Sequence, residues 1–319
     1  MSGTAQTTLP RGAISLRFDS DGTECDAWFF AGSDDSPFET DGNRPVVVMA
    51  HGFAGTKDSG LATFAQRFAD AGLAVFAFDY RGFGASEGEP RQTVSMAGQL
   101  EDYRAAMAAA ARLPGVDPRR LVLWGVSLAG GHVLAAAAHR DDVAAVVSLT
   151  PLVDGRAAGR HALAYHRPSA LLRSTVLGVR SKVGRPQMMP VVARPGELGA
   201  LTLDGCYDDY LALAGPTWRN EVDATVGLEL GSHRPGRQAE HVRAPLLVQI
   251  ADLDRSAPPQ AAAKAAFAGR AEVRHYPCDH FDVWPGKDWF EPAVRHQLLF
   301  LTRHLAPAAA VGSRSAVEL

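Results

Sequence analysis

The chain has 319 residues, of which 46% are hydrophobic, and its formal net charge at pH 7 is -3. This length and apolar content suffice for one large α/β domain with a sizeable core, or for a domain that carries an insertion. A charge close to zero, without a dense run of Lys and Arg, argues against a nucleic-acid partner.

Membrane-spanning and disulfide-rich proteins are disfavoured as well. Residues 1–10 are polar, and no stretch reaches the roughly 18 uninterrupted apolar residues that a membrane span needs. Cys25, Cys206 and Cys278 have no C-x-x-C spacing, which indicates neither a disulfide framework nor a zinc site. We therefore expect a cytoplasmic protein with no metal, no membrane partner and no nucleic-acid partner, and self-association into a homo-oligomer stays open.

The strand pattern begins with a hairpin. Residues 13–18 alternate apolar and polar side chains, turn residues follow at 19–22, and residues 25–30 complete a pair of antiparallel edge strands. Apolar runs typical of buried parallel strands follow at 45–50, 73–78, 121–124, 143–149 and 245–250, with a last strand at 272–276.

Helical segments lie between these strands. The spacing of Leu61, Phe64, Ala65 and Phe68 predicts one helix, and others are expected at 95–112, after Ser127 and at about 261–267. A terminal helix carries on one face Phe290, Val294, Leu298 and Leu301. Alternating strands and helices predict right-handed crossovers and a mostly parallel sheet with helices on both faces.

The alternation stops at about residue 151 and resumes after residue 243. The intervening stretch is rich in Arg, Pro and scattered aromatic residues, and it contains a predicted helix that begins at Pro168. That helix carries on one side Leu171, Leu172, Val176 and Val179. We predict a core formed by residues 11–150 and 244–305, an inserted cap at 151–243, and a loose tail at 306–319.

Ser127 is the first candidate for chemistry. The strand-like run 121–124 leads through Gly125 to Ser127, and small residues and a helix-forming stretch follow. This is the sequence form of a sharp strand-to-helix corner that presents a nucleophile. The strained backbone there needs small neighbours, which are Gly125, Ala129, Gly130 and Gly131.

A serine hydroxyl needs a base, and the base needs an orienting acid. Residues that follow strands lie at the carboxyl edge of an α/β sheet, where functional crevices form. His280 and Asp254 both follow predicted strands, and the chain order Ser, Asp, His is one of the known orders of this triad. For the oxyanion of an acyl-transfer reaction, we expect backbone N–H donors at Leu128 and Phe53.

Five segments in order carry a family resemblance: His51-Gly52-Phe53, residues 79–84, residues 125–131, Asp254 before Pro258, and His280-Phe281-Asp282. This set resembles the α/β-hydrolase superfamily, and within it the bacterial serine hydrolases near dienelactone hydrolase and the cocaine-esterase or X-Pro dipeptidyl-peptidase type. The resemblance implies the α/β-hydrolase fold and a Ser-His-Asp hydrolase of esters, thioesters, lactones or amides. It also implies that no metal or organic cofactor is needed.

Two positions depart from the family pattern. Ala129 stands where the second glycine of G-x-S-x-G is usual, and Asp279 precedes the histidine where glycine is frequent. We place Asp279 outside the triad, with its side chain pointing away. Two rivals to Asp254 as the acid are Asp252, two residues earlier, and Asp154, which follows the strand at 143–149.

Other conspicuous residues have simpler interpretations. We expect His51 to shape the oxyanion loop, and His132 and His275 to be structural. Arg81 is interpreted as an anchor for loop carbonyls or a carboxylate, and Cys278 as a buried small residue.

Residues that contact substrate are expected in two regions. Tyr80 and Phe83 lie in the loop that follows a strand, and the predicted cap offers Tyr207, Tyr210 and Trp218. The function predicted is cleavage of a small acyl substrate (a carboxylic ester, lactone or thioester) through an acyl-enzyme on Ser127. The alternatives are an acyltransferase or lyase of a biosynthetic pathway on the same scaffold, whose cap would exclude water, and a catalytically inactive binding protein.

Overall fold

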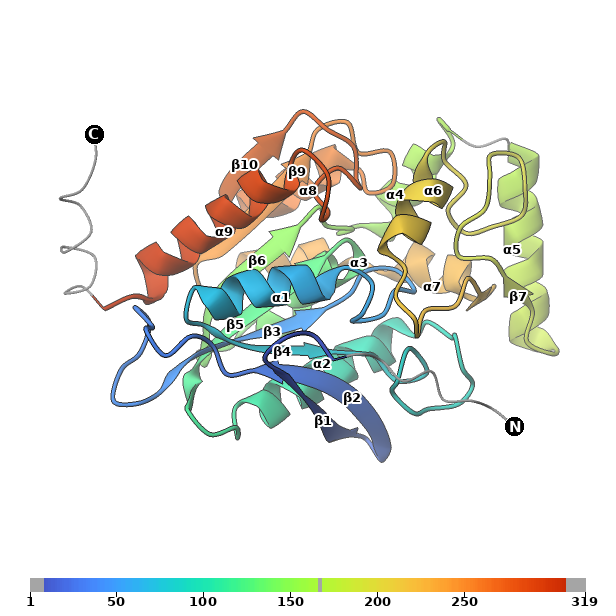
Figure 1. Cartoon of the computed structure of the whole chain (residues 1–319). Helices are drawn as coiled ribbons and strands as arrows, with labels where there is room; N and C mark the ends of the chain where they lie inside the picture. Colours follow the sequence, from blue (N-terminus) through green and yellow to red (C-terminus); the bar gives the residue numbers. More distant parts are fainter. Residues whose placement is uncertain (1–8, 166–167, 308–319) are drawn as a thin grey trace.

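An eight-stranded sheet forms the centre of the protein in a computed structural model that describes residues 9–165 and 168–307. The strand order is β1-β2-β4-β3-β5-β6-β9-β10 (Figure 1). Strand β2 pairs antiparallel with β1 and β4, and the remaining pairs are parallel. The strands are β1 (Ala13–Ser20), β2 (Thr23–Phe30), β3 (Arg44–Ala50), β4 (Ala74–Phe78), β5 (Val116–Val126), β6 (Val143–Leu149), β9 (Leu246–Ala251) and β10 (Glu272–Tyr276).

Helices cover both faces of this sheet. Helices α1 (Leu61–Asp70) and α9 (Phe290–Leu305) contact each other on one face, and α2 (Met96–Ala110) and α3 (Leu128–Ala137) do so on the other, where α8 (Pro259–Ala268) also lies (Figure 1). The predicted α/β-hydrolase fold is confirmed. Strand β5 begins before the predicted run, because Val116 pairs with Arg44 ahead of an irregularity in the register.

The segment between β6 and β9 forms smaller elements that gather beside one end of the sheet, at the right in Figure 1. They are α4 (Gly155–Ala162), α5 (Pro168–Val183), β7 (Met188–Met189), α6 (Cys206–Leu213), β8 (Val222–Asp223), α7 (Val226–Ser232) and the 3-10 helix Pro235–His241. The boundaries of the cap stay a prediction. Of the predicted tail, residues 308–319 lie outside the described residues.

Helix α5 begins at Pro168 as the sequence predicts, but its apolar side faces solvent. Leu172, Val176 and Val179 are 65%, 47% and 46% exposed. Periodicity locates an apolar stripe without locating the surface that would cover it. The side chain of Leu171 lies outside the described residues. Within the described ranges, no helix combines the length and the apolar character that crossing a membrane requires.

A buried ion cluster ties the loop after β3 to the sheet. The Lys57 ammonium, 1% exposed, lies 2.5 Å from Asp26 Oδ1 and 2.6 Å from Asp79 Oδ2. The backbone N–H of Lys57 also donates to Asp79 Oδ1 over 2.6 Å. Burial lowers the pKa of Lys57, but the two carboxylates outweigh burial and raise it, so the side chain is charged at neutral pH.

Replacing Lys57 with alanine is expected to destabilise the fold by about 3–5 kcal/mol, because Asp79 would remain buried without its cation and Asp26 would keep only Arg17, 3.2 Å away. The free energy of unfolding in urea measures this loss. Arg243→Ala is the matched control, since its pair with Asp141 is exposed and an exposed pair contributes at most about 1 kcal/mol. Equal losses in the two variants would contradict the role assigned to the cluster.

Candidate active site

Ser127 is the single residue between β5 and α3, and its backbone is strained as a nucleophile corner requires. Its φ is +57° and its ψ is -117°, a combination that side-chain-bearing residues rarely adopt. A Cβ on Gly125 would lie 2.2 Å from the Ala129 carbonyl oxygen, and one on Gly52 would lie 2.9 Å from Ser127 Cβ. The corner therefore closes only with glycine at both positions, while Ala129 fits within the helix.

His280 and Asp254 meet Ser127 at the carboxyl edge of the sheet. Asp254 follows β9 and His280 follows β10, which are neighbouring parallel strands. His280 Nε2 lies 3.0 Å from Ser127 Oγ, and His280 Nδ1 lies 2.6 Å from Asp254 Oδ2. The structure thus brings together the three side chains that the sequence singled out, at hydrogen-bonding distances.

The Asp254 carboxylate is held in place on its other side as well. Its Oδ1 accepts hydrogen bonds from the backbone N–H groups of Ser256, over 2.8 Å, and Ala257, over 2.7 Å. The side chain is buried, and both oxygens are occupied. A carboxylate fixed in this way directs the Nδ1 proton of His280 and leaves Nε2 as the acceptor that faces Ser127.

Both rival acids are engaged elsewhere. Asp252 Oδ1 contacts His275 Nδ1 over 2.6 Å at the exposed edge of the sheet. Asp154 caps α4, where its Oδ1 accepts from two backbone N–H groups of the first turn. Neither forms a hydrogen bond with His280 among the described residues, whereas Asp254 does.

Contrary to the expectation from the sequence, the Asp279 side chain does not point away from the His280 loop but forms hydrogen bonds within it. Its Oδ1 accepts from the backbone N–H of His280 over 2.7 Å, and its Oδ2 accepts from Arg255 Nε over 2.5 Å. The hydrogen bonds of the His280 ring go instead to Asp254 and Ser127. Asp279 therefore makes no hydrogen bond with the His280 ring among the described residues, but it supports the loop that carries His280.

The charge environment raises the pKa of His280 above its usual 6.5. Burial acts in the opposite direction, but the charge and hydrogen bond of Asp254, together with the charge of Asp279, outweigh it. A neutral imidazole is required to accept a proton, and a raised pKa keeps the ring protonated to higher pH.

We expect kcat/KM for ester hydrolysis to fall as the pH is lowered, with a midpoint above 6.5, because protonation of His280 removes the base. A pH profile of kcat/KM measures this midpoint in the free enzyme. Asp279→Asn removes one of the charges that raise the pKa and should move the midpoint to lower pH. A wild-type midpoint below 6.5, or a flat acidic limb, would contradict the assignment of His280.

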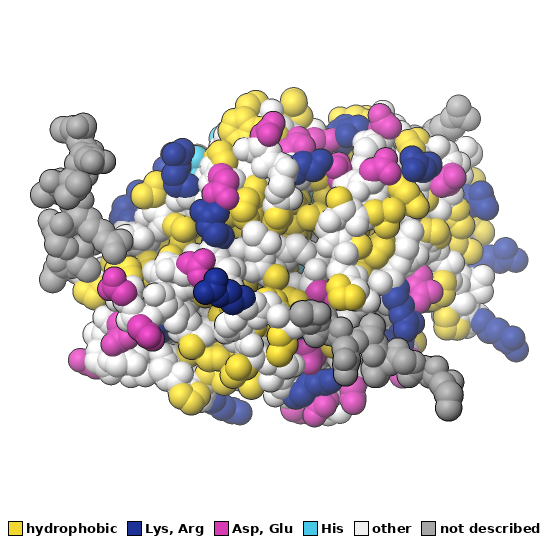
Figure 2. All heavy atoms as spheres, viewed as in Figure 1, with side chains coloured by type: hydrophobic (Ala, Val, Ile, Leu, Met, Phe, Trp, Pro, Cys, Tyr) yellow, Lys and Arg dark blue, Asp and Glu magenta, His cyan; other side chains and the backbone are white. Residues whose placement is uncertain are grey.

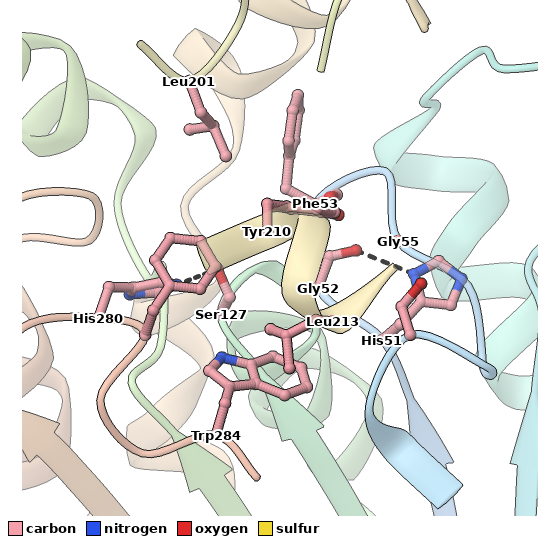
Figure 3. A pocket seen from close by; sticks show the side chains of 12 residues that line it. His51, Gly52, Phe53, Gly55, Ser127, Leu201, Tyr210, Leu213, His280 and Trp284 are labelled. Carbon is pink, nitrogen blue, oxygen red and sulfur yellow. Dashed lines mark hydrogen bonds between the residues drawn. The ribbon is translucent and has the colours of Figure 1, made fainter. Parts of the chain in front are cut away.

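A small apolar cavity of about 40 Å³ opens at Ser127 and His280 (Figure 3). At about 10–15 Å³ per water-sized group, this volume holds about three such groups. Its other walls come from the loop after β3, from the predicted cap and from the loop after β10, and they are His51, Gly52, Phe53, Gly55, Ser59, Leu201, Tyr210, Leu213, Phe281 and Trp284.

The predicted oxyanion loop is held by the predicted cap. The Tyr210 hydroxyl donates to the Phe53 carbonyl over 2.6 Å, and the Trp218 indole donates to the Ala54 carbonyl over 3.0 Å. Leu128 begins α3, so its N–H is among the first four of that helix, which have no intrahelical acceptor. The assignment of the Phe53 and Leu128 N–H groups as oxyanion donors remains a prediction.

The other predicted substrate contacts lie outside this cavity. Tyr80 and Phe83 are each 1% exposed and pack in the core beside the imidazole of His51. A position after a strand does not fix which way a side chain points, and these two rings turn inward. Tyr207 lies against the guanidinium of Arg194 instead of the cavity.

The structural interpretations of the remaining residues agree with their contacts. His51 Nδ1 lies 2.9 Å from the Gly52 carbonyl, and buried His132 Nε2 lies 2.9 Å from Gln99 Oε1. Arg81 Nε donates to the Asp102 carboxylate over 2.6 Å. Cys278 is buried, and burial raises the pKa of its thiol to about 12, so it is a neutral thiol.

Sequence reasoning missed part of the cavity wall, namely Gly55, Ser59, Leu201, Leu213 and Trp284. Leu201 and Leu213 come from the predicted cap, where no motif marks them, and Trp284 lies four residues after His280. For Trp284, its short distance from His280 in the sequence is a signal that could have placed it near the site. Within the described residues, no group of three His, Cys, Asp or Glu side chains is arranged to hold a metal ion.

The sequence of this chain matches the family model described as serine aminopeptidase, S33, a hydrolase family, over residues 41–278. The match covers more than half of the chain and includes Ser127 and Asp254. The chain belongs to this family. Membership of the S33 family, together with the fold, identifies an enzyme of the α/β-hydrolase type.

Relatives of this S33-family chain include the quorum-quenching protein AidA of Acinetobacter baumannii (strain MDR-ZJ06). It is 36% identical over 309 residues, which cover 94% of this chain and 98% of AidA. The structure of the α/β hydrolase GrgF of Penicillium sp. sh18 superposes with a TM-score of 0.74 at 24% identity. The superposition covers 92% of this chain and 99% of the GrgF chain. Hypothetical protein PA2218 of Pseudomonas aeruginosa has a TM-score of 0.76 at 20% identity, with 96% and 98% covered. The two structures show the shared fold.

Proposed function

We propose that this S33-family chain is a serine hydrolase that cleaves a carboxylic ester, lactone or thioester through an acyl-enzyme on Ser127. The observation that carries the proposal is the hydrogen-bonded series from Ser127 Oγ to His280 Nε2, and from His280 Nδ1 to Asp254, at the wall of a small apolar cavity.

In the first half of the reaction, His280 Nε2 accepts the proton of the Ser127 hydroxyl as its oxygen attacks the carbonyl carbon of the substrate. Asp254 stabilises the resulting imidazolium. The N–H groups of Leu128 and Phe53 are the proposed donors to the oxyanion, each worth about 3 kcal/mol in the transition state. His280 then returns the proton to the leaving alcohol or thiol, and the acyl group stays on Ser127.

The second half repeats this sequence with water as the nucleophile. His280 takes a proton from water, the hydroxide attacks the acyl-enzyme, and the acid leaves as Ser127 regains its proton. Each proton step uses the same Nε2 atom, which is why one imidazole held by one carboxylate is sufficient. No step in this scheme calls on a metal or an organic cofactor.

Names of relatives guide the choice of substrates. One relative is named a quorum-quenching protein, and another, 40% identical over 112 residues or 35% of this chain, is named a thiohydrolase. We therefore propose small acyl compounds with an ester, lactone or thioester bond. The test is a panel of p-nitrophenyl esters, thioesters, lactones and anilides, with Ser127→Ala as the control. Turnover of anilides alone would contradict the proposed bond type.

A second candidate function is acyl transfer, which is favoured by the small, largely apolar cavity and by the naming of GrgF as a polyketide transferase. Over a shorter stretch of 148 residues, which is 46% of this chain, the identity with GrgF is 33%. Adding an alcohol or thiol acceptor to the ester assay separates the two functions. Hydrolysis predicts mainly free acid, whereas a transferase would form the new ester or thioester faster than the acid.

A further inference from the structure

One polar atom of the cavity wall, Trp284 Nε1, has no partner among the described residues and faces the side of the cavity where Ser127 and His280 lie (Figure 3). Within the part of the chain that the structure describes, the polar side-chain atoms of the lining residues have hydrogen-bond partners, with two exceptions, His51 Nε2 and Trp284 Nε1. The satisfied ones are those of Ser59, Ser127, Tyr210 and His280, together with His51 Nδ1.

The two exceptions differ in position. The His51 imidazole packs against the buried ring of Tyr80, with 4.9 Å between centroids, and Figure 3 shows it on the far side of Gly52 from Ser127. The indole nitrogen of Trp284 lies on the edge of the ring that is directed toward Ser127 and His280 (Figure 3). Of the two unpartnered nitrogens, that of Trp284 is therefore the one that faces Ser127 and His280 (Figure 3).

Packing fixes the Trp284 ring in this orientation. A Cβ on Gly60 would lie 2.9 Å from both Cε3 and Cζ3, which belong to the benzene edge away from the nitrogen. The ring of Phe64 lies edge-on to it, with 6.0 Å between centroids. Trp284 is 7% exposed, and its Nε1 is buried without an acceptor among the described residues.

An indole N–H can only donate a hydrogen bond. Leaving such a buried donor without an acceptor has a free-energy cost, and buried polar groups normally have partners. The neighbouring walls at Leu213 and Phe281 are apolar and offer no side-chain acceptor. Because no acceptor among the described residues reaches this nitrogen, a substrate that fills the cavity is the group that can supply one.

We propose that Trp284 Nε1 is a specificity-determining donor, and that the preferred substrates carry a hydrogen-bond-accepting oxygen close to the scissile bond. A keto, ether, hydroxyl or amide-carbonyl oxygen in the part of the substrate that enters the cavity provides this acceptor. This inference rests on the proposed serine-hydrolase function. It adds that an oxygen-bearing substrate is preferred over a purely hydrocarbon one of the same length.

The test compares esters that differ only in one CH2 group replaced by oxygen. On the acyl side, p-nitrophenyl methoxyacetate is paired with the butyrate, and p-nitrophenyl 3-methoxypropanoate with the pentanoate. On the alcohol side, 2-methoxyethyl butyrate is paired with butyl butyrate. For each pair, the ratio of kcat/KM values is divided by the ratio of alkaline hydrolysis rates, which removes the intrinsic reactivity of the ether ester.

We expect at least one pair to show a normalised preference for oxygen of about tenfold in the wild type, which matches one hydrogen bond to an otherwise unpaired buried donor. In Trp284→Phe this preference should fall to about one. Leu213→Ala is the matched control, because it enlarges the same cavity without removing a donor and should retain the preference. Trp289→Phe, in the same loop but outside the cavity wall, should also retain it.

The outcomes separate this inference from the function on which it rests. Turnover that depends on Ser127 but shows no normalised preference for oxygen in any pair overturns the inference. The proposed serine-hydrolase function is then unaffected. If Trp284→Phe fails to fold, the wild-type ratios alone decide between these outcomes. Absence of turnover that depends on Ser127 overturns both. An equal loss of preference in Leu213→Ala would assign the selectivity to cavity shape and overturn the role of the indole.

Discussion

Replacing Ser127 with alanine is expected to lower kcat for ester hydrolysis by a factor on the order of 10⁶, because the variant has no atom that can form the acyl-enzyme. Residual turnover would come from the remaining oxyanion donors and from substrate binding. The measurement is the initial rate on p-nitrophenyl butyrate with purified protein, with circular dichroism to show that the variant is folded.

Ser232→Ala is the matched control for this loss. Ser232 is exposed at the end of α7, and its hydroxyl donates to a carbonyl of its own helix. We expect wild-type kcat in that variant. Wild-type activity in folded Ser127→Ala would remove Ser127 from the mechanism.

Asp254→Asn is expected to lower kcat by about 10⁴-fold at neutral pH. An asparagine amide can present its NH2 group to His280 Nδ1, which then becomes the acceptor and moves the ring proton to Nε2. In that tautomer Nε2 cannot take the proton of Ser127. The loss should appear in kcat, with a much smaller change in KM, because Asp254 does not line the substrate cavity.

The rival acid supplies the control for this prediction. Asp252→Asn changes the same residue type two positions away, at an exposed side chain paired with His275. We expect less than about a twofold effect on kcat there, in keeping with the small contribution of exposed pairs. A larger loss in Asp252→Asn than in Asp254→Asn would transfer the role of the acid to Asp252.

The catalytic candidates could be predicted from the sequence because their signals are local. Ser127, Asp254 and His280 each follow an apolar strand, and parallel strands bring such positions to one edge of the sheet. The need for glycine at position 125 could also be recognised, since the corner leaves no room for a side chain there. The same alternation of strands and helices predicted the order of elements in the core.

The part of the cavity wall formed by Leu201 and Leu213 could not be predicted in this way, nor could the buried ion cluster. Leu201 and Leu213 reach the site from a region without periodic pattern, and Lys57 gains its two carboxylate partners from β2 and the loop after β4. Such contacts join residues far apart in the chain, and no local spacing encodes them. Tyr80 shows the reverse error, because its position after a strand suggested the crevice although its ring is in the core.

Charged and apolar side chains are interspersed over the face of the molecule shown in Figure 2, with no broad field of one sign. This distribution agrees with the net charge of -3. Electrostatic steering of a strongly charged substrate would need a surface dominated by one sign. The small acyl compounds proposed as substrates do not need such a surface for binding.

The most direct test of the central claim is labelling of the folded wild-type protein with a fluorophosphonate probe, followed by mass spectrometry of its peptides. The serine oxygen displaces fluoride from phosphorus, so the adduct marks the activated nucleophile. We predict one adduct, on Ser127, that is absent in Ser127→Ala and forms far more slowly in Asp254→Asn. An adduct on a different residue, or ester turnover by protein that takes up no label, would contradict the proposed mechanism.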